Sequence, residues 1–349
     1  MTEQPRILLI RPSALGDVFR SVPLVASLSR AFPETPIDWV VQEEFSDAIR
    51  AHPAVSRVIG FPRRRLQHWW RSPPAMATGW RFFRGLRGNY AVAIDAQGLA
   101  RSGLMAFASG ARRRIGFADA SEGAWLGYNA RIAVSADASA VDRMLGLLEG
   151  AGIEPIADCR LRVPEDAESG WSAWRSATIG GAGFVAIAPT SRWTSKEWPE
   201  DHWRRLVEGL LVERLAERIV LLGAASETDR LRELAGDRAE VVVMAGAGPL
   251  AMSMAAVRDS ALLVANDSAM LHAAVGFDVP LVGLFGPTDP VISGPYGRVT
   301  DCIASPLADA AVHYRDQGLG DRLMRAIPVD EVLEACRDRL TATRTEAGT

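Results

Sequence analysis

Short apolar runs alternate with amphipathic stretches along this chain, and this alternation constrains its fold more than any other feature. In the first half the apolar runs lie at 6–10, 37–41, 57–59 and 91–95, and a helical pattern occupies 18–30. A second helix is expected near 43–51. Strand-like runs that alternate with helical patterns predict parallel strands joined by crossover helices. We therefore expect an α/β fold built on a parallel sheet.

The same pattern starts again in the second half. The expected strands there are 184–188, 218–222, 240–244, 261–265 and 280–285, and the expected helices are 200–216, 226–235, 249–257 and 268–276. At 349 residues the chain is also longer than one hydrophobic core usually supports. We predict two Rossmann-like domains, 1–162 and 171–328, with 163–170 as the linker.

Composition excludes several classes of protein. No apolar run is long enough to span a membrane, and the N-terminus enters the first strand without the features of a signal peptide. The three cysteines, Cys159, Cys302 and Cys336, lie far apart and lack metal-ligand spacing. We expect a cytoplasmic protein with reduced thiols and no bound metal.

Positive charge is concentrated in one stretch of a chain whose net charge is −3. Twelve arginines lie between Arg57 and Arg114, against the single acid Asp95. Such a stretch favours an anionic partner, whether phosphorylated lipid, nucleic acid or an acidic sugar. The alternative is a set of solvated helix faces. With Trp69, Trp70, Trp80, Phe82 and Phe83 among them, these arginines also suit the surface of an anionic membrane.

Each unusual polar segment follows a predicted strand, where open α/β sheets bind their ligands. The first is the loop with Ser13, Gly16 and Asp17. Asp17 lies at a helix start, where an aspartate also serves as an ordinary cap. The loop has neither the G-x-G-x-x-G pattern nor a P-loop, which disfavours a nicotinamide enzyme.

The second segment contains the only lysine of the chain, Lys196, close to Thr190, Ser191 and Arg192. Because lysine is a compact point charge suited to phosphate oxygens, this loop is a candidate for holding a diphosphate without metal. The alternative is a basic solvent-exposed loop.

The third segment, Asp267 to His272, closes a strand and opens a helix of small residues. Free backbone N–H groups at such a helix start bind anions, with Ser268, Ala269 and His272 beside them. His272 is alternatively a satisfied core histidine. Glu227 follows another strand, where an acidic side chain can accept hydrogen bonds from a ribose diol. The segment Gly283 to Pro290 is expected to form a strand followed by a sharp turn.

Together these segments resemble glycosyltransferase family 9, the lipopolysaccharide heptosyltransferases, and most of all its heptosyltransferase I members. The motifs that support the resemblance are Ser13-x-x-Gly16-Asp17, Tyr90 to Leu99, Lys196-x-Trp198-Pro199, Asp267-Ser268-x-x-x-His272 and Phe285 to Pro290. They occur in the family's order from Ile7 to about Pro290.

The resemblance implies a GT-B fold, in which two Rossmann-like domains face each other across a cleft. Its first domain would bind the acceptor and its second an ADP-sugar, and a C-terminal helix, 329–349, would return toward the first domain. Asp17 would be the general base, and Lys196 would stabilise the leaving diphosphate. The donor would contact Thr190, Ser191, Arg192, Lys196, Glu227, Asp267, Ser268, Ala269 and His272. The acceptor would contact Ser13, Gly16, Arg63, Arg64, Arg65 and Gln97.

This chain departs from the family pattern at a few positions. Ser268 and Ala269 stand where a threonine and a glycine are usual, and Ser139 stands where a histidine is common. The stretch 116–129 is short and lacks a basic residue of the family. These differences fall mainly on the acceptor side, so the donor chemistry is less affected than the acceptor identity.

The expected activity is metal-independent, inverting transfer of a heptose or related sugar from an ADP-sugar to a lipopolysaccharide inner-core acceptor of the Kdo type. No cofactor is expected, and the chain would associate peripherally with the inner face of the cytoplasmic membrane. Two alternatives remain open, a sugar-nucleotide epimerase and a non-catalytic protein that binds nucleotide or lipopolysaccharide. Nucleic-acid binding is disfavoured because no recognition motif accompanies the arginines.

Overall fold

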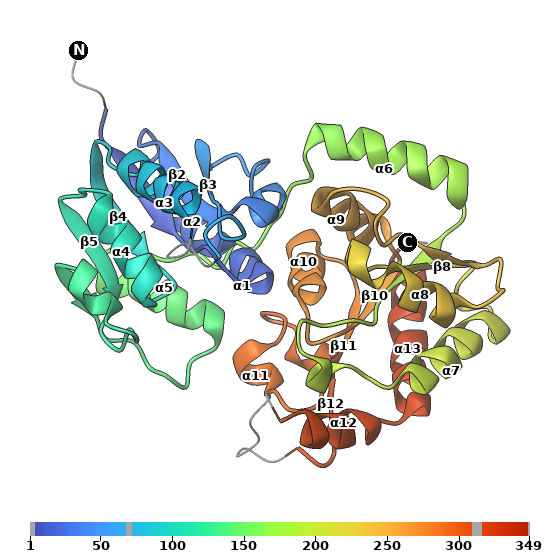
Figure 1. The fold of residues 1–349 in the computed structure, drawn as a ribbon. Helices are drawn as coiled ribbons and strands as arrows, with labels where there is room; N and C mark the ends of the chain where they lie inside the picture. The colour runs from blue at the N-terminus through green and yellow to red at the C-terminus, as the bar shows by residue number, and fades with distance from the viewer. Residues whose placement is uncertain (1–3, 68–71, 309–315, 348–349) are drawn as a thin grey trace. The chain divides into compact units, whose positions relative to one another are not determined.

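The computed structural model describes residues 4–67, 72–308 and 316–347. The chain divides into two compact units, Met1–Arg162 and Val163–Thr349. Each unit contains its own parallel sheet of six strands with helices on both faces (Figure 1). The predicted α/β class with two Rossmann-like domains is confirmed.

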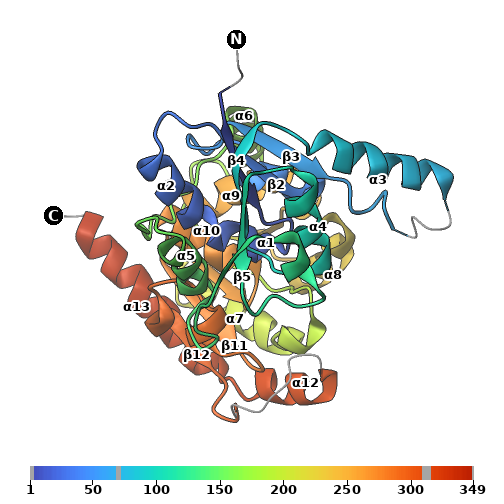
Figure 2. The same cartoon turned by 90° about the vertical axis from the view of Figure 1, so that its left-hand side faces the viewer.

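The first unit is built on a sheet with the strand order β3-β2-β1-β4-β5-β6, all parallel. Its strands are β1 (Arg6–Ile10), β2 (Ile37–Gln42), β3 (Arg57–Phe61), β4 (Tyr90–Asp95), β5 (Arg113–Phe117) and β6 (Ala130–Ile132). Its helices are α1 (Leu15–Arg20), α2 (Val22–Ala31), α3 (Pro73–Gly85), α4 (Ala100–Ala108) and α5 (Ala140–Gly150), with 3₁₀ turns η1 (Glu43–Ala48) and η3 (Ala124–Gly127). Helix α3 extends away from the rest of this unit (Figure 2).

The second unit repeats this plan with the order β12-β11-β10-β7-β8-β9. Its strands are β7 (Phe184–Ala188), β8 (Arg218–Leu221), β9 (Val241–Val243), β10 (Leu262–Asn266), β11 (Leu281–Phe285) and β12 (Cys302–Ala304). Its helices are α6 (Glu165–Thr178), α7 (Glu200–Val212), α8 (Thr228–Ala235), α9 (Leu250–Asp259), α10 (Ala269–Phe277), α11 (Pro290–Ser293), α12 (Gln317–Arg325) and α13 (Val329–Ala347), with 3₁₀ turns η4 (Thr194–Lys196), η5 (Ala225–Glu227) and η6 (Val299–Asp301).

Both sheets have the same internal order, and this order positions the candidate sites. In each sheet the first strand of the unit lies beside the fourth, so the chain reverses its direction of winding between β1 and β4 and between β7 and β10. Ligands of open α/β sheets bind beyond the strand ends at this switch point. The polar segments that follow β1, β4, β7 and β10 lie at the two switch points, whereas Glu227 follows β8 and the turn to Pro290 follows β11.

Several predicted elements differ from the structure. The predicted helix 18–30 is two helices, because α1 ends at Arg20 and α2 begins at Val22 with Pro23 in its first turn. The predicted helix 43–51 is the short 3₁₀ turn η1. The predicted linker 163–170 is largely the start of α6, whose first-turn acids favour a helix N-terminus.

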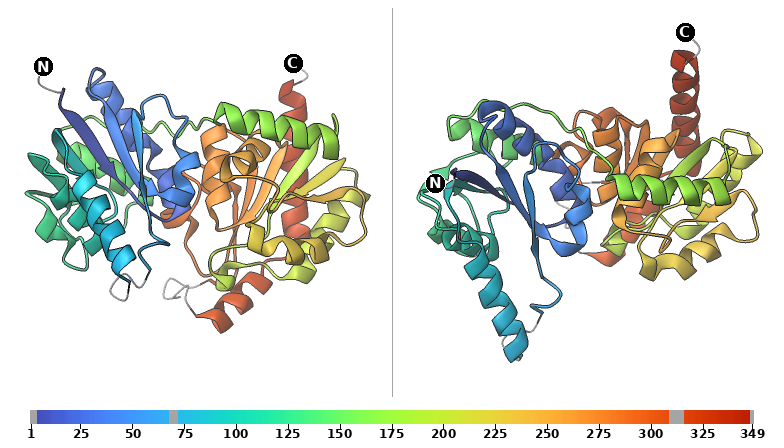
Figure 3. Two further views of the ribbon diagram at one scale, coloured as in Figure 1. Left: turned by 45° about the horizontal axis from the view of Figure 1, so that its top comes forward. Right: turned by 90° about the horizontal axis from the view of Figure 1, so that it is seen from above.

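Helix α13 packs within the second unit. It contacts α7 and the strands β10 and β11, and Val332, Cys336 and Leu340 enter the hydrophobic core there. Figure 3 shows the end of this helix extending beyond the sheet of its unit. Its expected return toward the first unit stays a prediction.

Candidate functional site

In the first unit, the loops after β1 and β4 are joined by one amide side chain. The backbone N–H of Ser13 donates to Oε1 of Gln97 at 3.2 Å, and Nε2 of Gln97 donates to the Ser13 hydroxyl at 3.3 Å. The buried carboxylate of Asp95, at the end of β4, accepts hydrogen bonds from the backbone N–H groups of Gln97 and Gly98. Two predicted acceptor residues, Ser13 and Gln97, therefore lie together at the first switch point.

Asp17 lies in the first turn of α1, with two arginines on its carboxylate. Its Oδ2 accepts from the backbone N–H of Ala14 at 3.1 Å and pairs with Arg11 at 3.0 Å, and its Oδ1 accepts from Arg20. The ordinary capping role weighed in the sequence is therefore present. The carboxylate remains about a quarter exposed, so a substrate hydroxyl can still reach it.

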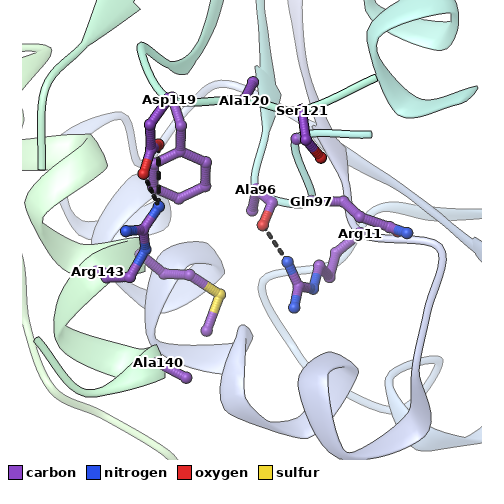
Figure 4. Close-up of a pocket in the computed structure, with 11 residues that line it drawn as sticks. Arg11, Ala96, Gln97, Asp119, Ala120, Ser121, Ala140 and Arg143 are labelled. Atoms are coloured by element: carbon purple, nitrogen blue, oxygen red, sulfur yellow. Dashed lines mark hydrogen bonds and ion pairs between the residues drawn. The ribbon is translucent and has the colours of Figure 1, made fainter. Parts of the chain in front are cut away.

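A pocket of about 230 Å³ opens beside this loop (Figure 4). Arg11 and Arg143 line it with Gln97 and Ser121, and Arg143 is held by a two-point ion pair with Asp119 at 3.0 Å. The volume lies below the usual range of about 300–1,000 Å³ for drug-sized ligands. Two guanidinium groups in so small a space suit a single acidic sugar. Neither Arg11 nor Arg143 was predicted as an acceptor-binding residue. Only Arg11 could have been found from the sequence, because it lies in the same loop as Ser13.

The predicted acceptor arginines 63–65 follow β3 and lie outside this pocket. Arg64 pairs with Glu44 at 2.7 Å, and Arg65 pairs with Glu43. The arginine-rich stretch is therefore less positive in the fold than in the sequence. Acids from β2 and η1 neutralise part of it, because parallel pairing of β2 and β3 brings residues about twenty positions apart together.

The aromatic residues of this stretch differ in exposure. Trp80 is exposed on α3 with the Arg84 guanidinium 4.9 Å from its ring centre. Phe82 and Phe83 are half-buried and pack on the core of the first unit, where the Phe82 ring lies 5.1 Å from that of Phe61. Trp69 and Trp70 lie outside the described residues.

In the second unit, Lys196 and Asp267 meet at the second switch point. The Lys196 ammonium donates to Oδ2 of Asp267 at 2.6 Å, and the Thr288 hydroxyl donates to the same oxygen at 2.8 Å. The Ser191 hydroxyl donates to the backbone carbonyl of Asp267 at 3.1 Å. Segments after β7, β10 and β11 therefore converge on one carboxylate, which holds the only lysine at the start of α10.

Two further polar residues fix the loop after β7. The buried Asn266 side chain donates to the Pro189 carbonyl at 2.6 Å and accepts from the Trp198 N–H at 3.0 Å. Glu197 accepts from the Ser191 N–H at 2.9 Å and pairs with Arg230. The sequence reasoning missed both residues, although each directly neighbours a predicted one.

The remaining predicted donor residues surround this loop. Thr190 donates to Glu227 at 3.0 Å, which ties the end of β7 to the turn after β8. Arg192 is exposed, with its guanidinium 5.9 Å from the ring centre of Trp193. His272 is buried in α10.

The start of α10 accommodates alanine at position 269, where the family usually has glycine. Ser268 is the N-cap in an extended conformation and Ala269 is the first helical residue, so no left-handed backbone is required of it. The Ser268 hydroxyl is buried, and the described part of the chain provides it with no hydrogen-bond partner. A hydroxyl without a partner at a helix start is arranged to donate to an anion.

The described residues contain neither a metal-ligand cluster nor a membrane-spanning helix. Within 4–67, 72–308 and 316–347, no three His, Cys, Asp or Glu side chains cluster as metal ligands would. Over the same ranges, no helix combines the length and apolarity that crossing a bilayer requires.

Two Rossmann-like units, the second with a cationic loop beside a helix start, are typical of glycosyltransferases of the GT-B class. The family model of glycosyltransferase family 9 (heptosyltransferase) matches residues 79–317. Lipopolysaccharide heptosyltransferase 1 of Pseudomonas aeruginosa is 32% identical over 84% of this chain and 82% of its own length. The Escherichia coli K12 enzyme of that name is 31% identical over 84% of this chain and 91% of its own. This chain belongs to glycosyltransferase family 9.

Solved structures agree with this assignment. The Escherichia coli heptosyltransferase WaaC with ADP is 26% identical and has a TM-score of 0.76, and the match covers 96% of this chain and 99% of WaaC. WaaC with ADP-2-deoxy-2-fluoro heptose is 28% identical with a TM-score of 0.75, over 94% of this chain and 99% of the other. The predicted family and GT-B fold are confirmed.

Proposed function

We propose that this glycosyltransferase moves a heptose from ADP-heptose to the inner core of lipopolysaccharide. The observation on which the proposal mainly rests is the Lys196–Asp267 contact, which holds a cation beside the unpartnered Ser268 hydroxyl at the start of α10. The family supports the same donor, since a relative has been solved with ADP and with a fluorinated ADP-heptose.

On the donor side, the leaving diphosphate would lie against the start of α10. Lys196, the Ser268 hydroxyl and the helix N–H groups would stabilise its developing charge, and Glu227 would accept hydrogen bonds from the ribose. Preorganised donors of this kind stabilise a leaving group without a divalent ion. We expect the reaction to be independent of metal.

On the acceptor side, the Arg11 and Arg143 pocket would bind an acidic sugar next to Asp17. The Asp17 carboxylate would then take the proton of the attacking hydroxyl as that oxygen bonds to the anomeric carbon and ADP departs. Displacement from the face opposite ADP inverts the anomeric configuration. Substrate binding would have to bring the donor and acceptor groups within bonding distance, as closure does in other transferases.

The place of action follows from the acceptor. A lipid-linked acceptor would bring the chain to the inner face of the cytoplasmic membrane, where it would associate peripherally and use cytoplasmic ADP-heptose. The exposed arginines of the first unit support this placement, because anionic lipid attracts them.

Calorimetric titration tests the donor assignment. ADP and UDP are each titrated with and without magnesium into the parent, Lys196→Ala and the control Arg232→Ala, which removes an exposed cation of α8. We expect ADP to bind without magnesium and to bind about tenfold or more weakly to K196A, with R232A unchanged. Preference for UDP, or a need for magnesium, contradicts the proposal.

A turnover assay separates the transferase from the other classes. An epimerase would change the ADP-sugar with no acceptor present, and a binding protein would release no ADP. We expect ADP release only when the acceptor is added, a product of inverted anomeric configuration by NMR, and no effect of EDTA.

A further inference from the structure

Four large apolar side chains project into solvent from two touching elements of the first unit. They are Leu104 and Phe107 on α4, which are 50% and 62% exposed, and Trp125 and Leu126 on η3, which are 40% and 71% exposed. We call them the α4–η3 patch. Leu104 and Phe107 are three positions apart and so share one face of the helix.

The two elements are packed closely enough to form one surface. A Cβ on Gly103 would lie 2.4 Å from the Ala124 carbonyl oxygen, and a Cβ on Gly127 would lie 2.1 Å from that of Gly103. Only glycine permits these approaches. The structure therefore maintains a rigid backbone contact directly beneath side chains that remain exposed, which is costly in water unless something covers them.

Arginines surround the patch. The Arg114 guanidinium lies 5.9 Å from the ring centre of Phe107 and donates to the Gly127 carbonyl. The Arg131 guanidinium lies 4.8 Å from the ring centre of Trp125, and Arg112 is exposed nearby in sequence. Glu122, two residues before η3, accepts from the N–H of Ala100. The rim of the patch is thus cationic.

We propose that the α4–η3 patch is the surface by which this protein inserts into an anionic lipid bilayer. Tryptophan, phenylalanine and leucine with a cationic rim are the composition of interfacial membrane anchors. A second copy fits less well, because a two-fold contact would bring the same arginines against each other without matching acids. The inference rests on the proposed function, which supplies a lipid-linked acceptor.

The patch is also continuous with the acceptor pocket. The segment from Phe117 to Ser121 lines the pocket and leads directly into η3, and α4 starts just after the pocket residue Gly98. At about 1.5 Å per residue, Phe107 lies about 10 Å along the helix axis from Ala100, where α4 begins. Insertion of the patch would thus hold the pocket near the height of sugars attached to the lipid headgroups.

Vesicle co-sedimentation of the full chain tests the proposal. The vesicles contain phosphatidylglycerol with phosphatidylethanolamine, or phosphatidylcholine alone. The variant is Phe107→Ser with Leu126→Ser, and the control is Val212→Ser with Val291→Ser, two exposed apolar residues of the second unit. We expect the parent and the control to bind the anionic vesicles, and the variant to bind them about tenfold or more weakly.

Each other outcome overturns the proposal. Equal vesicle binding by variant and parent would show that the patch does not insert, and binding to neither vesicle would remove the membrane as its occupant. A parent that dimerises without lipid, with a monomeric variant, would assign the patch to a second copy. ADP titration of the parent separates the two proposals, because a parent that binds the vesicles but not ADP would reject the proposed function alone.

Discussion

The Glu197 carboxylate lies between a backbone N–H of the loop after β7 and the Arg230 guanidinium of α8. One oxygen accepts from Ser191 at 2.9 Å, and the other pairs with Arg230 at 2.7 Å. Glu197 is buried, whereas Arg230 is nearly half exposed. Because the loop also contains Thr190 and Lys196, this pair fixes the position of two proposed donor-binding groups.

Glu197→Gln should therefore weaken donor binding while leaving the fold intact. Glutamine still accepts from Ser191 but no longer attracts Arg230, so the loop is held less firmly. We expect the KM for the ADP-sugar to rise about tenfold with a smaller change in kcat. Glu200→Gln, which removes the exposed pair with Arg204, is the control and should change neither constant. A fall in kcat alone would contradict a positioning role.

The substitution Asp17→Asn tests whether Asp17 is the general base. The amide keeps the size of the carboxylate but cannot take a proton, so kcat should fall about 10²–10⁴-fold. Affinity for ADP, measured by calorimetry, should be unchanged because the donor site lies in the other unit. Since Asp17 also accepts the N–H of Ala14, the melting temperature must be compared as well. Turnover within a few fold of the parent would reject Asp17 as the base.

The sequence predicted the sheets far better than the contacts between side chains. Buried strands such as β1, β4, β7 and β10 are continuous apolar runs and were predicted, whereas the strand order that creates the two switch points is known only from the structure. The strands β5, β6 and β12 were not predicted. Arg113 and Arg114 begin β5, and only three residues form β6, so neither has the apolar run of a central strand.

The candidate site could be predicted where its unusual residues lie close together in the sequence. Asp17, Lys196 and Ser268 each follow a strand and show an unusual residue type. Arg143 lies in α5, far along the chain from the Ser13 loop, and no motif near it in the sequence marks it as a pocket residue. The charge of the arginine-rich stretch was overestimated for the same reason, since the pairing acids Asp38, Glu43 and Glu44 lie outside the stretch.

Gly320→Ala should disturb the donor loop through packing alone. A Cβ at this position would lie 2.4 Å from the Ser195 carbonyl oxygen, so α12 would have to move away from η4 and Lys196. We expect a loss of about 1–3 kcal/mol in the free energy of unfolding, together with weaker ADP binding. Gly318→Ala in the same helix is the control, because its nearest neighbour is 3.8 Å away. Equal behaviour of the two variants would contradict close packing of α12 on η4.

Asp38 gives the first unit a dependence on pH. Its buried carboxylate accepts from Arg6, Arg57 and Tyr90. Burial alone would raise its pKa, but these hydrogen bonds together lower the pKa below the ordinary value of 3.8. The stabilisation is therefore present above about pH 4, and it is lost as the pH falls through the lowered pKa of the folded state.

Asp38→Asn should accordingly lower the free energy of unfolding at pH 7 by about 1–3 kcal/mol, because Arg6 and Arg57 lose their charged partner. The deficit should shrink as the pH falls below about 4, where the parent carboxylate is itself protonated in the unfolded chain. Urea titrations from pH 3 to pH 7 measure both effects. Asp47→Asn, which removes the surface pair with Arg50, is the control and should cost about 0–1 kcal/mol. A deficit for D38N that stays constant over this range would show that the lowered pKa of Asp38 does not contribute to stability.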